Sequence, residues 1–149
     1  MKKMKRLLTA VMAAALVIAV IPTALAAGGI FSDVPNGAWY ADAVEYVAAN
    51  GLMDGVGGRC FAPNDALTRA MFVTVLGRLV QINEADYTSV SFTDVTPGSW
   101  YAPYVEWAAQ QNIVNGMDSA RFAPNTPITR EQLPPNIARY VQRTGTARP

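Results

Sequence analysis

The sequence has 149 residues, a formal net charge of +1, one cysteine and no histidine. Without histidine the chain cannot form a Ser-His or Cys-His catalytic pair, and with one cysteine it forms neither an internal disulfide nor a His/Cys metal cage. Cys60 is therefore expected to be a loop thiol or the site of an intermolecular bridge.

Residues 1–26 are typical of an export signal. Four cations precede a 15-residue apolar run from Leu7 to Ile21, and the sequence Ala24-Leu25-Ala26 matches a cleavage site. The run is shorter than the roughly 20 apolar residues of a membrane-spanning helix, so we predict cleavage and no membrane contact afterwards. The remaining eight arginines and 11 acidic residues give a net charge of −3 (8 − 11). That charge disfavours binding to nucleic acid.

The rest of the chain contains a tandem repeat. The segment Phe31–Arg69 aligns without insertion with Phe92–Arg130, a shift of 61 residues, and 17 of 39 positions are identical. We predict repeat 1 over residues 30–82, a linker over 83–91, repeat 2 over 92–143 and a tail over 144–149.

Each repeat is predicted to be a helix, a loop and a second helix. Residues 41–50 carry apolar side chains at helical spacing, and Gly51 follows as a left-handed helix stop. After a turn at 54–58 comes Phe61-Ala-Pro-Asn64, in which Phe61 is expected to be buried. A second helix opens at Thr68, its N-cap, and places these apolar residues on one stripe: Phe72, Val75, Leu76 and Leu79.

In repeat 2 the first helix is predicted from Pro103 to about Gln111, with Asn112 in the place of Gly51. Pro134 and Pro135 break the repeat pattern, because they would lie inside a helix that began at Thr129. We therefore expect the last helix to be broken, or to restart near Pro135 and run to about Arg143. The predicted fold class is all-α.

Several blocks in fixed order resemble the S-layer homology family, whose modules hold bacterial surface proteins on the cell wall. The resemblance covers residues 30 to about 143 and is carried by these motifs and their counterparts in repeat 2: Phe31-x-Asp33-Val34 with Trp39-Tyr40, Gly51-Leu52-Met53-x-Gly55, Phe61-x-Pro63 and Leu67-Thr68-Arg69-Ala70. It implies helical repeats around a pseudo-threefold axis, here an incomplete bundle because only two repeats are present.

The resemblance also implies the ligand. Grooves between such repeats bind secondary cell-wall polysaccharide, often carrying ketal-linked pyruvate, and the family's Thr-Arg-Ala-Glu motif supplies an arginine to the negative charge. By position this implicates Arg69 and Arg130, with the pairs Asp33/Trp39 and Asp94/Trp100 as groove neighbours. The motif's glutamate is absent, since Met71 and Gln132 occupy its position.

Structural roles compete with these assignments. Arg69 and Arg130 stand at helix starts, which suits a carboxylate ligand, but either could pair with a repeat acid such as Glu45 or Glu106. For the Trp-Tyr pairs, a place in the core between helices competes with stacking on sugars. Asp33 and Asp94 are expected to cap local turns.

The sequence therefore predicts a secreted, wall-associated binding module without catalysis, cofactor or metal. Its predicted partner is cell-wall polysaccharide. The alternative is a structural protein that self-associates with other chains of the family to complete a three-unit assembly, or a truncated fragment of a larger anchored protein.

Overall fold

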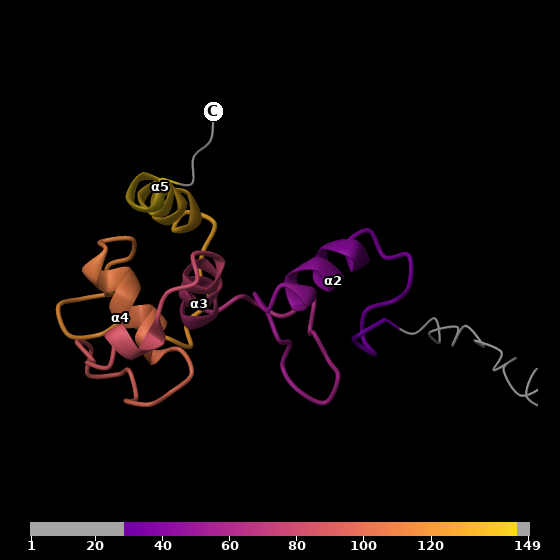
Figure 1. Cartoon of the computed structure of the whole chain (residues 1–149), viewed down its shortest axis with the longest axis horizontal. Coiled ribbons are helices and arrows are strands. Elements are labelled where there is room, and N and C mark those ends of the chain that lie inside the picture. The colour runs from indigo at the N-terminus through magenta and orange to yellow at the C-terminus, as the bar shows by residue number, and fades with distance from the viewer. Residues whose placement is uncertain (1–28, 146–149) are drawn as a thin grey trace, which may run out of the picture.

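The computed structural model describes residues 29–145, so the predicted export signal and the end of the tail lie outside the described residues. The described part contains four α-helices, one 3-10 helix and no β-strand (Figure 1). The α-helices are α2 (Ala41–Ala49), α3 (Arg69–Leu79), α4 (Ala102–Gln110) and α5 (Leu133–Thr144), and η1 spans Glu84–Asp86. The predicted all-α class is confirmed. Within 29–145 no helix is both long and apolar enough to cross a membrane.

The helix ends follow from local sequence. Thr68 is the N-cap of α3, and its hydroxyl accepts a hydrogen bond from the Met71 N–H at 3.2 Å. Gly51 and Asn112 follow α2 and α4 with φ of 64° and 54°, so both helices end in the predicted left-handed stop.

Helix α5 begins at Leu133, which confirms the expected restart. Both prolines then fall in the first turn, where a helix needs no N–H donor. Thr129 does not cap this helix, although its N–H donates to the Gln132 side chain at 3.2 Å.

The main core joins the two repeats, because α3 of repeat 1 packs against α4 of repeat 2. The two helices are in close contact at Gly77, where an added Cβ would lie 2.5 Å from Cδ1 of Tyr104. Trp107 lies beside it and is only 4% exposed. A larger residue at position 77 would therefore force the two helices apart.

A smaller core lies against α2 at the other end of the molecule (Figure 1) and consists of Phe31, Val34 and Val44. The Arg78 side chain ties it to α3 through Asp54 Oδ2 at 2.7 Å and the Leu52 carbonyl at 3.3 Å. Cys60 is half-buried nearby, as a free thiol. Figure 1 shows α2 standing apart from the group formed by α3, α4 and α5.

The structure adds two details of packing to the predicted elements. Leu79 is 52% exposed, and the face of α3 that meets α4 includes Val73 and Gly77. The segment predicted as a linker contains η1, whose Glu84 carboxylate accepts a hydrogen bond from the Tyr104 hydroxyl at 2.6 Å. Residues 83–91 thus pack on α4 as well as joining the repeats.

Candidate functional site

A backbone clip holds the start of α3 against the end of the repeat 2 loop. The N–H groups of Arg69 and Ala70 donate to the carbonyls of Thr126 and Pro124 at 2.9 and 3.0 Å, and Ile128 N–H donates to the Leu67 carbonyl at 2.9 Å. These bonds place the first turn of α3, with its positive dipole end, beside the loop of the other repeat.

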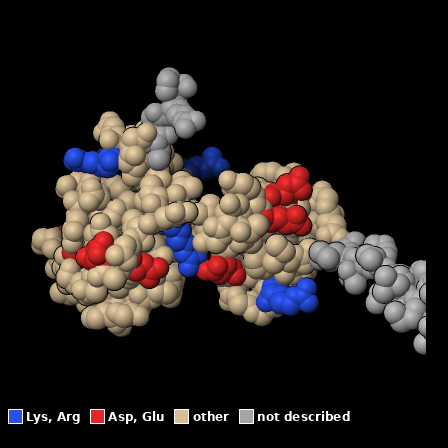
Figure 2. All heavy atoms as spheres, in the orientation of Figure 1, with Lys and Arg blue, Asp and Glu red and all other residues tan. Residues whose placement is uncertain are grey.

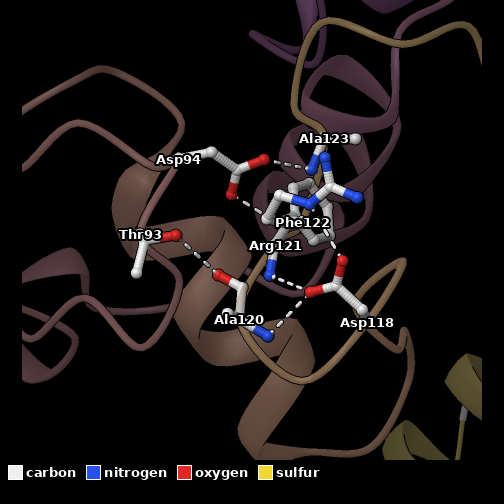
Figure 3. Close-up of polar contacts among 7 residues, drawn as sticks. All are labelled: Thr93, Asp94, Asp118, Ala120, Arg121, Phe122 and Ala123. Atoms are coloured by element: carbon white, nitrogen blue, oxygen red, sulfur yellow. Dashed lines mark hydrogen bonds and ion pairs between the residues drawn. The ribbon is translucent and has the colours of Figure 1, made fainter.

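Asp94 fixes the shape of that loop (Figure 3). Its two carboxylate oxygens accept hydrogen bonds from the N–H groups of Phe122 and Ala123 at 2.8 and 2.7 Å. Ala123 has φ of 59°, a left-handed conformation that costs energy for a residue with a Cβ and is held here by the carboxylate. In Figure 3, Asp118 binds the residues just before Phe122, through Ala120 and Arg121.

Asp33 makes the same clamp in repeat 1. Its oxygens accept from the Phe61 and Ala62 N–H groups at 2.8 and 2.7 Å. The hydrogen bond from Phe61 N–H is the largest effect on this carboxyl and lowers the pKa of Asp33. The expectation that both aspartates cap local turns was wrong, because their partners are 28 and 29 residues away.

Arg69 is buried, with 5% of its surface exposed. Its Nε donates to the Phe122 carbonyl at 2.8 Å, one terminal nitrogen donates to the Asn115 carbonyl at 2.7 Å, and the guanidinium lies 4.6 Å from the centre of the Phe122 ring. Burial lowers the pKa of Arg69, opposed by the charge of Asp94. The predicted competing partners do not bind it: Glu106 accepts from Ser91 and Gln110, and Glu45 is exposed.

A pocket of about 300 Å³ opens beside Arg69. It lies between the start of α3, the turn at 115–117 and the first half of α5, so both repeats contribute to it. Its lining residues are Arg69, Asn115, Gly116, Met117, Glu131, Gln132, Pro135, Asn136 and Arg139. Two arginines and one glutamate therefore line the same pocket.

Arg139 is the lining residue that the sequence reasoning missed. The 61-residue shift makes it the counterpart of Arg78, whose charge is neutralised by Asp54 at 2.7 Å. The counterpart of Asp54 is Asn115, which has no charge. Repeat 2 therefore keeps the arginine and loses its acid, a difference visible in the aligned sequence.

The other predicted site residues do not line this pocket. Arg130 is exposed before α5, and the two Asp/Trp pairs lie elsewhere. Trp39 and Trp100 are 94% and 55% exposed, each edge-on to the following tyrosine, so of the two roles considered for the Trp-Tyr pairs a place in the core is wrong for the tryptophans.

Within the described part of the chain, no three metal-ligating side chains of the His, Cys, Asp or Glu type come together. Figure 2 shows charged side chains scattered over a mostly uncharged face, with basic and acidic atoms meeting near the middle of the molecule. The part of this face that the structure describes therefore carries no broad basic surface.

Comparison with known proteins supplies the context for this site. A family model described as the S-layer homology domain matches residues 30–71 and 91–133. The chain is 37% identical over 110 residues to the endo-1,4-beta-xylanase A of Thermoanaerobacterium saccharolyticum, and the aligned region covers 74% of this chain and 9% of that protein. It is 30% identical over 129 residues to the S-layer protein sap of Bacillus anthracis, covering 87% of this chain and 16% of that protein.

A third relative is the surface-layer 125 kDa protein of Lysinibacillus sphaericus, 31% identical over 116 residues, or 75% of this chain and 10% of that protein. The chain thus spans 9–16% of the length of these three relatives. S-layer and cell-surface proteins among the relatives support the predicted location, secreted and associated with the cell wall. With both matched segments falling on the two repeats, the chain belongs to the S-layer homology domain family.

Proposed function

We propose that the chain anchors non-covalently to the bacterial cell wall, and that the pocket between its repeats binds an acidic cell-wall polysaccharide. The observation that carries the proposal is the arginine at position 139, which lines the pocket without the aspartate that neutralises its counterpart in repeat 1. Family membership and wall-associated relatives support the anchoring role.

The chemistry of the pocket suits a carboxylate on a sugar, such as ketal-linked pyruvate. A guanidinium offers paired N–H donors that match the two oxygens of a carboxylate. Arg69 is held in place by two carbonyls, while Arg139 is half-buried and lines the same pocket as Asn115. Glu131 opposes binding of an anion, so we assign the principal contact to Arg139 and a supporting positive field to Arg69.

The size of the pocket suits a short stretch of polymer. About 300 Å³ is at the lower end of the range for small-ligand sites. One such contact is weak, and retention on a wall then depends on several anchors that bind one repeating polymer. The exposed residues Trp39 and Trp100, with Asp33, Asp94 and Arg130, remain proposed accessory contacts outside the pocket.

The test is co-sedimentation of purified protein with cell-wall sacculi. Binding is expected to fall when acid treatment removes the secondary polymer, and also when only the ketal pyruvate is hydrolysed. Equal binding to treated and untreated walls contradicts polysaccharide anchoring. Loss of binding only with the whole polymer contradicts the carboxylate assignment and leaves anchoring in place.

Two substitutions test the pocket. Asn115→Asp restores the acid found in repeat 1, so Arg139 is neutralised and wall affinity is expected to fall about tenfold, the loss of one charge-assisted contact of ~1.5 kcal/mol. Arg139→Gln is expected to do the same. Arg143→Gln, on the same helix but outside the pocket lining, is the matched control and retains full binding.

A further inference from the structure

The helices at the two ends of the molecule, α2 and α5, are the repeat counterparts of α4 and α3, which pack against each other in its middle. Helix α3 of repeat 1 packs on α4 of repeat 2. The 61-residue shift relates α2 to α4, and the first two-thirds of α5 to α3. Among the described residues, 29–145, α2 therefore has the position of an α4 on which no α3 packs, and α5 that of an α3 on which no α4 packs.

On α5 the face in question is an apolar stripe at positions i, i+3, i+4 and i+7, which share one side of a helix. Ile137 is 45% exposed, whereas its counterpart Leu76 is 8% exposed. Ala138 is likewise exposed, whereas Gly77 is buried under Tyr104. The exposed residues of the stripe are Pro134, Ile137 and Ala138, and their counterparts Val73, Leu76 and Gly77 are buried. Val141, like its counterpart Val80, is half-buried and packs on the main core.

On α2 the matching face is the side turned away from its small core. Tyr46 is 64% exposed, whereas its counterpart Trp107 is 4% exposed. Ala43 is exposed, whereas Tyr104 is 5% exposed. The two aromatic residues of α4 that are buried against α3 thus have exposed counterparts on α2.

Side-chain size is matched across the two exposed faces. In the α3–α4 contact a glycine, Gly77, leaves room for the Tyr104 ring, and an added Cβ would collide with that ring. On α5 the same position is Ala138, which has the colliding methyl group, and on α2 the ring is gone because Ala43 replaces the tyrosine. A Gly–Tyr contact in the middle therefore corresponds to an Ala–Ala contact between the ends, in which the Ala138 methyl group meets no aromatic ring.

Charge is also complementary. Helix α2 carries Asp42 and Glu45 and no base, whereas α5 carries Arg139 and Arg143 and no acid. Opposite charge on two docking elements favours their encounter and disfavours pairing of two copies of the same helix.

The arginine before α5 fits the same arrangement. Arg69 of repeat 1 donates hydrogen bonds to the carbonyls of Phe122 and Asn115. Both carbonyls belong to repeat 2, whose first helix packs on α3. The counterpart of Arg69, Arg130, is exposed. In an equivalent contact between copies, Arg130 would meet the loop at Phe61 and Asp54 of the second copy, the counterparts of those two carbonyl residues.

We propose that two copies of this chain associate head to tail, with α5 of one copy packed on α2 of the next in the manner of α3 on α4. The interface is heterologous, since the two docking faces are different surfaces of the molecule. Each copy in a pair keeps one unoccupied face, so association continues past the dimer. This assembly forms without polysaccharide, and the stripe on α5 lies outside the pocket lining.

The first test uses two variants that each block one face. Ala43→Arg places bulk and positive charge on α2 against the arginines of α5, and Ile137→Arg places a charge in the α5 stripe. Sedimentation velocity between roughly 10 μM and 1 mM, the range of weak association, is expected to show wild-type species larger than a dimer and only monomer for either variant. An equimolar mixture is expected to form dimers and nothing larger, because one intact face of each kind remains.

The mixture separates the proposal from non-specific adhesion. Restored dimers require folded proteins, so a variant that simply failed to fold would give none, and circular dichroism of each variant identifies that case. Ile137→Glu then replaces a misfolded Ile137→Arg, and Ala43→Glu replaces a misfolded Ala43→Arg. Wild-type protein that stays monomeric at 1 mM, or folded variants whose mixture stays monomeric, overturns the proposal.

A second test changes the sizes of the two side chains that meet in the proposed interface, Ala43 and Ala138. Ala43→Tyr is expected to weaken association about tenfold, because the ring meets the Ala138 methyl group, and Ala138→Gly in the same chain is expected to restore it by recreating the Gly77–Tyr104 pair. Ala49→Arg is the matched control for Ala43→Arg, because Ala49 is exposed on the same helix but off the docking face. Equal loss of association in both arginine variants, or no rescue by Ala138→Gly, contradicts the proposed interface.

Discussion

The two repeats share a sequence pattern but differ in how deeply the matching positions are buried. Phe122 is fully buried in the main core, whereas its counterpart Phe61 is only half-buried beside α2. The same difference holds for Trp107 and Tyr46. Because the main core forms between the repeats, burial at a repeat position depends on whether a neighbouring repeat covers it. In repeat 2, α3 packs on the first helix, whereas in the described part of the chain no helix packs on the first helix of repeat 1 in that way.

The largest expected effect is at Phe122, the residue before Ala123, which has the left-handed backbone conformation. Phe122→Ala removes a fully buried ring that packs on Phe92 at 5.6 Å and lies under the Arg69 guanidinium, and is expected to lower the free energy of unfolding by about 3–5 kcal/mol. Phe61→Ala, at a half-buried ring, is expected to cost less than half as much. Urea unfolding of both variants gives the comparison, and equal losses would contradict the difference between the two cores.

Arg69 and Arg130 form the next comparison. Arg69→Ala leaves two carbonyls without their donor and removes a cation from the Phe122 ring, so we expect a loss of about 2–4 kcal/mol. Arg130→Ala is expected to change stability by less than about 0.5 kcal/mol, since the side chain is exposed. Thermal unfolding of monomeric protein measures both. A small effect of Arg69→Ala would show that its burial contributes little.

The pH dependence of stability distinguishes Glu106 from its exposed counterpart Glu45. Burial raises the pKa of Glu106, but hydrogen bonds from Gln110 and Ser91 outweigh it and lower the pKa below its ordinary 4.5. A group whose pKa is lowered by folding stabilises the protein above that ordinary value and loses this contribution as the pH falls through the folded value. Wild-type stability is therefore expected to fall on acidification below about pH 4.5.

Urea unfolding at pH 7 and at pH 3 measures this contribution. Glu106→Gln is expected to be less stable than wild type at pH 7, by about 1–2 kcal/mol, and to lose less on acidification. Glu45→Gln, at the exposed counterpart, is the control. If Glu106→Gln kept the full acid dependence of the wild type, the Ser91 and Gln110 contacts would not be its source.

Local features of the fold were predictable from sequence, and contacts between the repeats were not. Thr68 caps α3 and Asn112 ends its helix because each acts on its own neighbours in the chain. Exposure of Leu79 and Trp39 depends on which helix lies across from them, and one repeat alone does not specify that. The pocket residue Arg139 was predictable from the change from Asp54 to Asn115 between the repeats, but identities between the repeats do not reveal it, because the signal is the loss of an acid.

The smallest expected effect tests that paired change from the side of repeat 1. Asp54→Asn removes the acid that pairs with Arg78 and makes this position identical to Asn115 of repeat 2. The aspartate side chain is 69% exposed, so solvent screens the pair and the loss is expected to be about 0.3–0.8 kcal/mol. It should shrink further in 1 M salt, where charges are screened within about 3 Å. A loss above about 2 kcal/mol, unchanged by salt, would mean that the ion pair joins α2 to α3 much more firmly than its exposure implies. The removal of its counterpart in repeat 2 would then have cost stability as well as leaving Arg139 without a neutralising acid.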